Sequence, residues 1–151
     1  MTRPRVLLAD DHKEVCDSVV RLLTPEFEVV GVVQDGQQLL SAESGMLPDV
    51  CVIDISMPGM YGIEAARILK ATGSRAEIVF LTVHEDPDFV RAALDLGALG
   101  YVMKSRIASD LCTAIRVALT GGSFISPSQT EIEDRVRWPW FETRGATGSC
   151  K

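Results

Sequence analysis

The stretch Asp49-Val50-Cys51-Val52-Ile53-Asp54 decides the fold of this chain. Four apolar residues stand together and an acid follows them, a pattern that predicts a short buried strand. Similar runs recur along the sequence, at residues 6–9, 27–33, 78–82 and 100–104. The run at residues 6–9 ends at Asp10 and Asp11, and its unbroken apolar character is typical of a strand buried on both faces.

Helical patterns separate these runs. After the first strand, in residues 13–23, Val15, Val19 and Leu22 stand at the spacing of one helix face. Further helices are expected from Gly36 to near Gly45, over residues 63–71, from the segment at residues 85–88 to near Gly97, and over a last stretch that ends at Gly121 and Gly122. This alternation predicts an α/β fold: a doubly wound parallel sheet of five strand–helix units with helices on both faces.

Composition and charge narrow the classes of protein. The chain has 151 residues, enough for one domain with its own core. Hydrophobic residues make up 46% and charged residues 24%, which excludes a largely disordered chain. The formal net charge of −6 argues against binding of nucleic acid across the whole surface. The N-terminal apolar run is too short for a signal peptide or a membrane span, so we expect a cytoplasmic protein without membrane contact.

Polar and charged residues follow the predicted strands. Asp10 and Asp11 follow the first strand, Asp54 ends the third, Thr82 ends the fourth and Lys104 ends the fifth. The carboxyl ends of parallel strands meet at one edge of the sheet, where such folds bind their ligands. We therefore expect three carboxylates, a hydroxyl and an ammonium group in one pocket.

The chemistry of this set favours phosphoryl transfer. Three carboxylates repel one another unless a cation joins them, and Mg²⁺ (or Mn²⁺) prefers oxygen ligands. A carboxylate such as that of Asp54 can act as a nucleophile and form an aspartyl phosphate. Lys104 can pair with a phosphoryl oxygen, and the Thr82 hydroxyl can donate a hydrogen bond to another. His12, beside the acidic pair, is expected to be a residue at a helix start because Mg²⁺ prefers oxygen.

Two other classes of protein share such a sheet. A phosphatase or dehalogenase with Asp54 as nucleophile usually has a second acid two residues later, where this chain has Ser56. A nucleotide-binding or flavin-binding module has a glycine-rich turn after the first strand, where this chain has Asp-Asp-His. The four cysteines and two histidines also lack the spacing of zinc ligands.

Several motifs together resemble one family. They are VLLADDH around Asp10 and Asp11, VIDISMPGMYGIE around Asp54, FLTVH around Thr82, and GYVMKS around Tyr101 and Lys104. Over about residues 4–124 the chain resembles the receiver domain of bacterial two-component response regulators. Its sequence looks most like receivers of the LuxR/NarL-type subfamily. This resemblance implies a flavodoxin-like fold with strand order 2-1-3-4-5 and a receiver domain over residues 1–124.

The resemblance also assigns the phosphoryl and metal site. It implies that Asp54 accepts a phosphoryl group from a sensor histidine kinase or a phosphotransfer protein. Asp11 would bind Mg²⁺ directly and Asp10 mainly through water. Asp54 and the backbone carbonyl of Ser56 would complete the protein ligands. Lys104 would hold the phosphoryl group.

A conformational switch is part of the same resemblance. Thr82 would move toward the phosphoryl group, Tyr101 would turn inward behind it, and the surface of the fourth helix, fifth strand and fifth helix would change. Ser56 and His84 would line the site and tune the lifetime of the phosphorylated form. Homodimerisation on phosphorylation is a further expectation. The protein would be no enzyme beyond its own phosphorylation and dephosphorylation.

The C-terminal tail, residues 125–151, contains no recognisable output domain. Only 25 residues follow Ser126, and a helix-turn-helix module needs roughly 60. We therefore expect no binding of nucleic acid by this chain itself. It is either a stand-alone receiver or a fragment of a longer DNA-binding regulator; a receiver that docks without phosphorylation is the third alternative. The segment Pro127–Phe141, with the motif WPWF, is expected to form a short helix on the receiver or a partner, to fold back or to be disordered.

Overall fold

The structure is a computed structural model that describes residues 2–127. The predictions for the WPWF motif fall outside the described residues. A parallel sheet of six strands forms the centre, in the order β2-β1-β3-β4-β5-β6. The strands are β1 (Arg5–Ala9), β2 (Glu28–Val33), β3 (Val50–Asp54), β4 (Glu77–Thr82), β5 (Gly100–Met103) and β6 (Phe124–Ile125). The predicted parallel α/β fold and its order 2-1-3-4-5 are confirmed, and β6 extends it at one edge.

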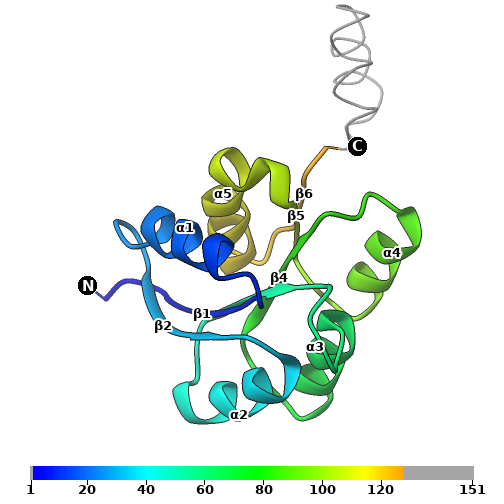
Figure 1. The fold of residues 1–151 in the computed structure, drawn as a ribbon, viewed down its shortest axis with the longest axis horizontal. Helices are drawn as coiled ribbons and strands as arrows, with labels where there is room; N and C mark the ends of the chain where they lie inside the picture. Colours follow the sequence, from blue (N-terminus) through cyan, green and yellow to red (C-terminus); the bar gives the residue numbers. More distant parts are fainter. Residues whose placement is uncertain (1, 128–151) are drawn as a thin grey trace, which may run out of the picture.

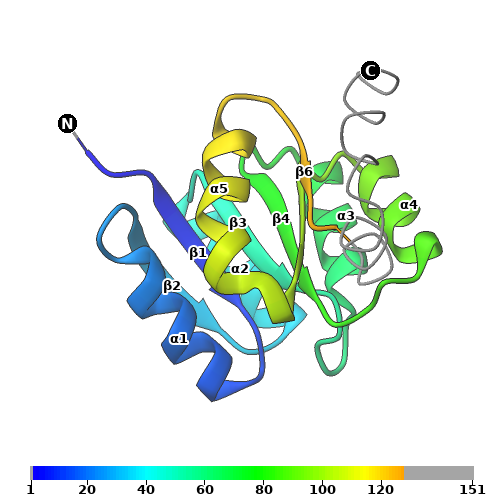
Figure 2. The same cartoon turned by 90° about the horizontal axis from the view of Figure 1, so that it is seen from above.

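Helices cover both faces of the sheet (Figures 1 and 2). On one face lie α1 (Lys13–Leu23) and α5 (Ile107–Leu119). On the other lie α2 (Gly36–Met46), α3 (Gly62–Ala71) and α4 (Pro87–Asp95). Each face has its own apolar core because strand residues alternate between the two sides.

Local chemistry places the helix starts as predicted. Asp35 precedes α2 and accepts a hydrogen bond from the Gln38 N–H at 2.8 Å. Asp86 precedes α4 and accepts one from the Asp88 N–H, also at 2.8 Å, and Pro87 opens that helix. These carboxylates satisfy backbone donors that a helix leaves without partners in its first turn.

The structure differs from the sequence predictions at the ends of several elements and on one helix face. β5 stops at Met103, so Lys104 opens a single turn of 3-10 helix, η1 (Lys104–Arg106). β6 pairs with β5 and crosses the predicted domain boundary at residue 124. On α1, Val19 is buried as expected, but Cys16 and Leu23 are its buried companions, while Val15 and Leu22 are only partly covered. Within residues 2–127, no helix is both long and apolar enough to cross a membrane.

Candidate functional site

Three strand ends bring the predicted site residues together. Asp10 directly follows β1, Asp54 ends β3, and Lys104 directly follows β5. The register pairs Ala9 with Ile53, which places the next residues, Asp10 and Asp54, at the same edge of the sheet. The Asp10 N–H donates to the carbonyl of Val33 at 3.0 Å, which holds the acidic loop against β2. The predicted convergence is therefore observed.

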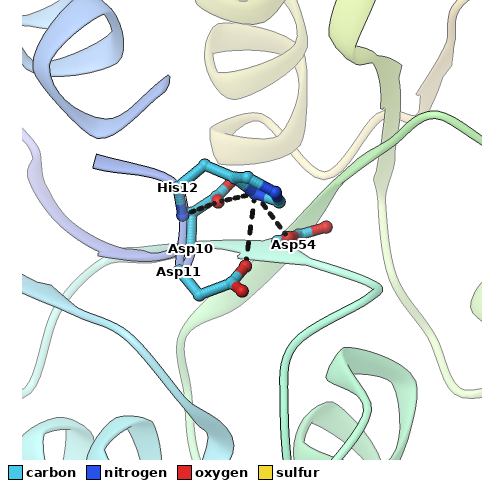
Figure 3. A group of neighbouring side chains, drawn as sticks. All are labelled: Asp10, Asp11, His12 and Asp54. Atoms are coloured by element: carbon cyan, nitrogen blue, oxygen red, sulfur yellow. Dashed lines mark hydrogen bonds and ion pairs between the residues drawn. The ribbon is translucent and has the colours of Figure 1, made fainter. Parts of the chain in front are cut away.

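The acidic residues form one cluster around a histidine (Figure 3). One ligand atom each of Asp10, Asp11, His12 and Asp54 lies within 4.8 Å of the others. His12 Nδ1 is 3.0 Å from Asp10, 3.2 Å from Asp11 and 3.9 Å from Asp54. Asp10 and Asp54 are buried, while His12 and Asp11 face solvent. His12 thus starts α1 as predicted, and its side chain also occupies the middle of the carboxylates, which sequence reasoning missed.

Lys104 bridges the two buried carboxylates. Its Nζ lies 3.0 Å from Asp10 Oδ2 and 3.2 Å from Asp54 Oδ2. Burial by itself lowers the pKa of the Lys104 ammonium, but the carboxylates of Asp10 and Asp54 outweigh it and raise that pKa above its usual value. Both distances are those of close ion pairs. Among the described residues, these two Oδ2 atoms are the buried side-chain oxygens with no hydrogen bond besides their contact with Lys104.

Asp54 has an environment that disfavours its charge. Burial raises the pKa of the Asp54 carboxyl, and the neighbouring charge of Asp10 raises it further, against the lowering effect of the Ser56 N–H and Lys104. The Ser56 N–H donates to Asp54 Oδ1 at 3.1 Å. Behind the site, α3 packs so closely that a Cβ on Gly62 would stand 2.2 Å from the Asp54 carbonyl oxygen. This position therefore requires glycine.

The donor set fits a hard divalent cation. One ammonium, that of Lys104, pairs with the carboxylates of Asp10 and Asp54, and Asp11 adds a third carboxylate to the cluster, so negative charge is in excess. Mg²⁺ takes oxygen ligands and is usually held by one or two carboxylates together with water. Asp10, Asp11 and Asp54 offer such oxygens from one cluster. The exposed ring of His12 lies among the same three carboxylates, with Nδ1 within 3.9 Å of each.

Thr82, the predicted switch hydroxyl, is buried at the end of β4. Its Oγ1 accepts a hydrogen bond from the His84 N–H at 2.8 Å. The ring of His84 in turn reaches Ser56, with 3.0 Å between His84 Nε2 and Ser56 Oγ, and stacks on Phe89 of α4 with ring centroids 4.7 Å apart. Ser56 and His84 were both expected to line the pocket, and the structure brings them into direct contact.

Tyr101 lies inward already in this structure. Its side chain is 2% exposed, and its hydroxyl donates to the carbonyl of His84 at 3.0 Å. Burial raises the pKa of this phenol. The predicted inward turn of Tyr101 on activation would therefore start from a side chain that is already inward. The backbone of His84 instead joins Thr82 and Tyr101 through its N–H and its carbonyl.

Comparisons with known proteins agree with this geometry. The family model described as the response regulator receiver domain matches residues 6–116. The transcriptional regulatory protein DegU of Brevibacillus brevis is 35% identical over 128 residues, which are 83% of this chain and 54% of that protein. LiaR of Bacillus subtilis is 37% identical over 119 residues, which are 78% of this chain and 56% of that one. The chain thus spans little more than half the length of these curated relatives.

Solved structures show the same likeness. The signal receiver domain of a NarL regulator from Mycobacterium tuberculosis superposes with a TM-score of 0.76 at 30% identity, over 80% of this chain and 99% of that one. A LuxR-family two-component response regulator from Aurantimonas sp. gives a TM-score of 0.78 at 33% identity, over 89% and 99%. With its parallel sheet and its acidic pocket, the chain belongs to the response regulator receiver family and is related to regulators of the LuxR/NarL type.

Proposed function

We propose that Asp54 of this receiver accepts a phosphoryl group from the phosphohistidine of a sensor histidine kinase or a phosphotransfer protein. The observation that carries the proposal is the buried Asp54 carboxylate, whose Oδ2 lies in the acidic cluster 3.2 Å from the Lys104 ammonium. A carboxylate can act as a nucleophile and form an aspartyl phosphate. An ammonium group beside it is placed to pair with a phosphoryl oxygen.

The proposed transfer exchanges one bond to phosphorus for another. An Asp54 carboxylate oxygen forms the new P–O bond while the P–N bond of phosphohistidine breaks, and the histidine nitrogen leaves with the electron pair of that bond. Asp10, Asp11, Asp54 and the carbonyl of Ser56 would hold Mg²⁺ (or Mn²⁺). A bound divalent cation neutralises charge that develops on the phosphoryl oxygens. Lys104 moves from its ion pairs with Asp10 and Asp54 to the new phosphoryl group.

We propose that the backbone of His84 transmits the conformational change from Thr82 to Tyr101. A phosphoryl group adds about −1.5 to −2 charge at pH 7, and the Thr82 hydroxyl gains an acceptor oxygen. A shift of Thr82 toward that oxygen pulls on its hydrogen bond with the His84 N–H, and the His84 carbonyl holds the Tyr101 hydroxyl. Tyr101 stands on β5, beside α4, so we propose that this surface, with α5, carries the signal. Homodimerisation on phosphorylation is a prediction of the same proposal.

The second candidate function is that of a receiver within a longer regulatory protein. The curated relatives DegU and LiaR are transcriptional regulatory proteins, and this chain covers 54% and 56% of their lengths. The chain is therefore also proposed as the receiver part of a DNA-binding regulator, with no DNA contact by the described domain itself. A receiver that docks without phosphorylation is the alternative to both, and we propose no turnover of external substrates in any of the three.

Intact-mass spectrometry tests the phosphorylation. The protein is treated with acetyl phosphate, with Mg²⁺ or with a chelator, beside the variants Asp54→Asn and Asp17→Asn. Asp17 is an exposed acid of α1 and serves as the matched control. We expect one phosphoryl adduct that depends on Mg²⁺, is absent in Asp54→Asn and persists in Asp17→Asn. Equal labelling of both variants would contradict the assignment of Asp54, and no adduct in any sample would favour the docking receiver.

A further inference from the structure

A groove between α4 and strands β5 and β6 lies outside the acidic pocket. Its volume is about 720 Å³. Its apolar lining comes from three elements: Val90 and Leu94 of α4, Tyr101 and Met103 of β5, and Ile125 of β6. Leu94 and Ile125 are 43% and 45% exposed. Large apolar side chains that gather around an open groove favour a binding surface.

The chain leaves the sheet at the rim of this groove. Ser126 lines the groove directly after β6 and is itself buried. Its N–H donates to the carbonyl of Tyr101 at 2.8 Å, and its Oγ donates to Asp110 Oδ2 at 2.7 Å. The Met103 N–H donates to the same Oγ at 3.2 Å. These bonds join Ser126 to β5 and α5, so the residues that follow start from a fixed point beside the groove.

The sequence that follows carries large aromatic side chains. Both tryptophans of the chain, Trp138 and Trp140, stand there with Phe141 beside them. Trp138 is 12 residues beyond Ser126, and 12 extended residues span up to about 40 Å, so the tether does not limit access to the groove.

Charged residues stand both at the groove and in this segment. The acids Glu85 and Asp95 stand at the groove with one base, Arg91. Arg135 and Arg137 precede the first tryptophan. Because Glu131, Glu133, Asp134 and Glu142 stand around these arginines, charge does not favour docking, and the fit rests on the aromatic side chains and the apolar lining of the groove.

We propose that the segment of this chain with Trp138 and Trp140 docks into the groove between α4, β5 and β6 of the same molecule. The tail would then cover the face through which we propose that the receiver signals, and partners of that face would compete with it. The proposal stands on the groove, the position of Ser126 and the aromatic sequence. It does not depend on phosphorylation of Asp54.

Tryptophan fluorescence of the full chain tests the proposal, because both tryptophans belong to the proposed occupant. Acrylamide quenching of the chain is compared with that of a peptide of residues 128–151. Two groove variants, Leu94→Glu and Ile125→Glu, are measured beside the control Val32→Glu. Val32 is 43% exposed, like Leu94, but stands on β2 at the opposite edge of the sheet. Each variant is first required to keep the wild-type thermal unfolding transition.

We expect the wild-type tryptophans to be quenched less than those of the peptide. Leu94→Glu and Ile125→Glu should each raise quenching toward the level of the peptide and shift the emission to the red, while Val32→Glu should change neither. Quenching of the wild type at the level of the peptide would overturn the proposal, as would groove variants without effect. Protection that increases with protein concentration, together with a doubled mass in sedimentation, would assign the groove to the tail of a second copy and overturn docking within one molecule.

Discussion

Replacement of Lys104 by methionine tests the electrostatic balance of the acidic pocket. Methionine keeps much of the apolar stem of lysine but has no charge. The Lys104 side chain is 12% exposed, and its Nζ stands 3.0 and 3.2 Å from two buried carboxylate oxygens. The variant Lys104→Met therefore leaves Asp10 and Asp54 buried side by side without their cation.

The magnitude follows from these distances. At an effective dielectric constant of about 20, each of the two ion pairs contributes roughly 5 kcal/mol of attraction. Desolvation offsets much of this, and loss of one partner of a buried ion pair typically costs about 3–5 kcal/mol of stability. We expect a loss in this range at pH 7, since the remaining carboxylates then repel each other or one of them must be protonated. Mg²⁺ at a hundredfold excess over its Kd should restore about 2.7 kcal/mol.

Urea unfolding at pH 7, with and without Mg²⁺, measures the effect. The matched control is Lys13→Met, because Lys13 also pairs with an aspartate, Asp17, at 3.4 Å, but is 82% exposed. Its loss should stay within about 0.5 kcal/mol, as for other exposed ion pairs. If Lys104→Met costs no more than Lys13→Met, then Lys104 does not balance the buried carboxylates, and the argument for an excess of negative charge fails.

Three further predictions concern the groups around the site. Gly62→Ala should destabilise the domain by about 1–3 kcal/mol in thermal or urea unfolding, because the added Cβ would clash with the Asp54 carbonyl oxygen. The same variant should slow phosphorylation of Asp54. Gly45→Ala, at a helical position with open space, should instead stabilise by about 0.5–1 kcal/mol; equal effects would contradict the packing argument. Thr82→Ala should lower the free energy of unfolding by about 1 kcal/mol and still permit phosphorylation. It should reduce the NMR chemical-shift changes of α4 and β5 on phosphorylation, and undiminished changes would refute the role of Thr82 in the switch. Asp110→Asn should cost about 2 kcal/mol at pH 7. Burial raises the pKa of the Asp110 carboxyl, but hydrogen bonds from Arg106, Ser126 and Ser109 outweigh burial and lower that pKa. The stabilisation of the folded state by ionised Asp110 is therefore present above the ordinary carboxyl pKa. It is lost as pH falls through the pKa of Asp110 in the folded state. The difference between Asp110→Asn and wild type should therefore shrink at acid pH, and a constant difference would contradict this role.

Much of the fold could be predicted because apolar runs and acids mark the strand ends. The runs before Asp10 and Asp54 are long and unbroken, so their burial and their common edge follow from the rule for parallel sheets. β6 was missed because two residues carry no periodicity. The shift of Lys104 out of β5 has a similar cause: the apolar run itself ends at Met103, and the sequence does not mark the turn of η1.

Parts of the site depend on side-chain directions that the sequence does not encode. Adjacency to Asp11 was the only signal at His12, and it did not show that the ring turns back over the carboxylates. Ser56 and His84 lie 28 residues apart, so their contact depends on how two loops pack. The inward rotamer of Tyr101 is likewise set by burial against α4 and by the carbonyl of His84, and the sequence alone allows either direction.

The most direct test of the central claim is to locate the phosphoryl group chemically. After treatment with acetyl phosphate and Mg²⁺, borohydride reduces an aspartyl phosphate to homoserine, and peptide mass spectrometry identifies the converted residue. We expect homoserine at position 54 and unchanged aspartates at Asp10 and Asp11. Conversion at Asp10 or Asp11, or labelling of the protein without conversion of Asp54, would contradict the assignment of Asp54 as the phosphoryl acceptor.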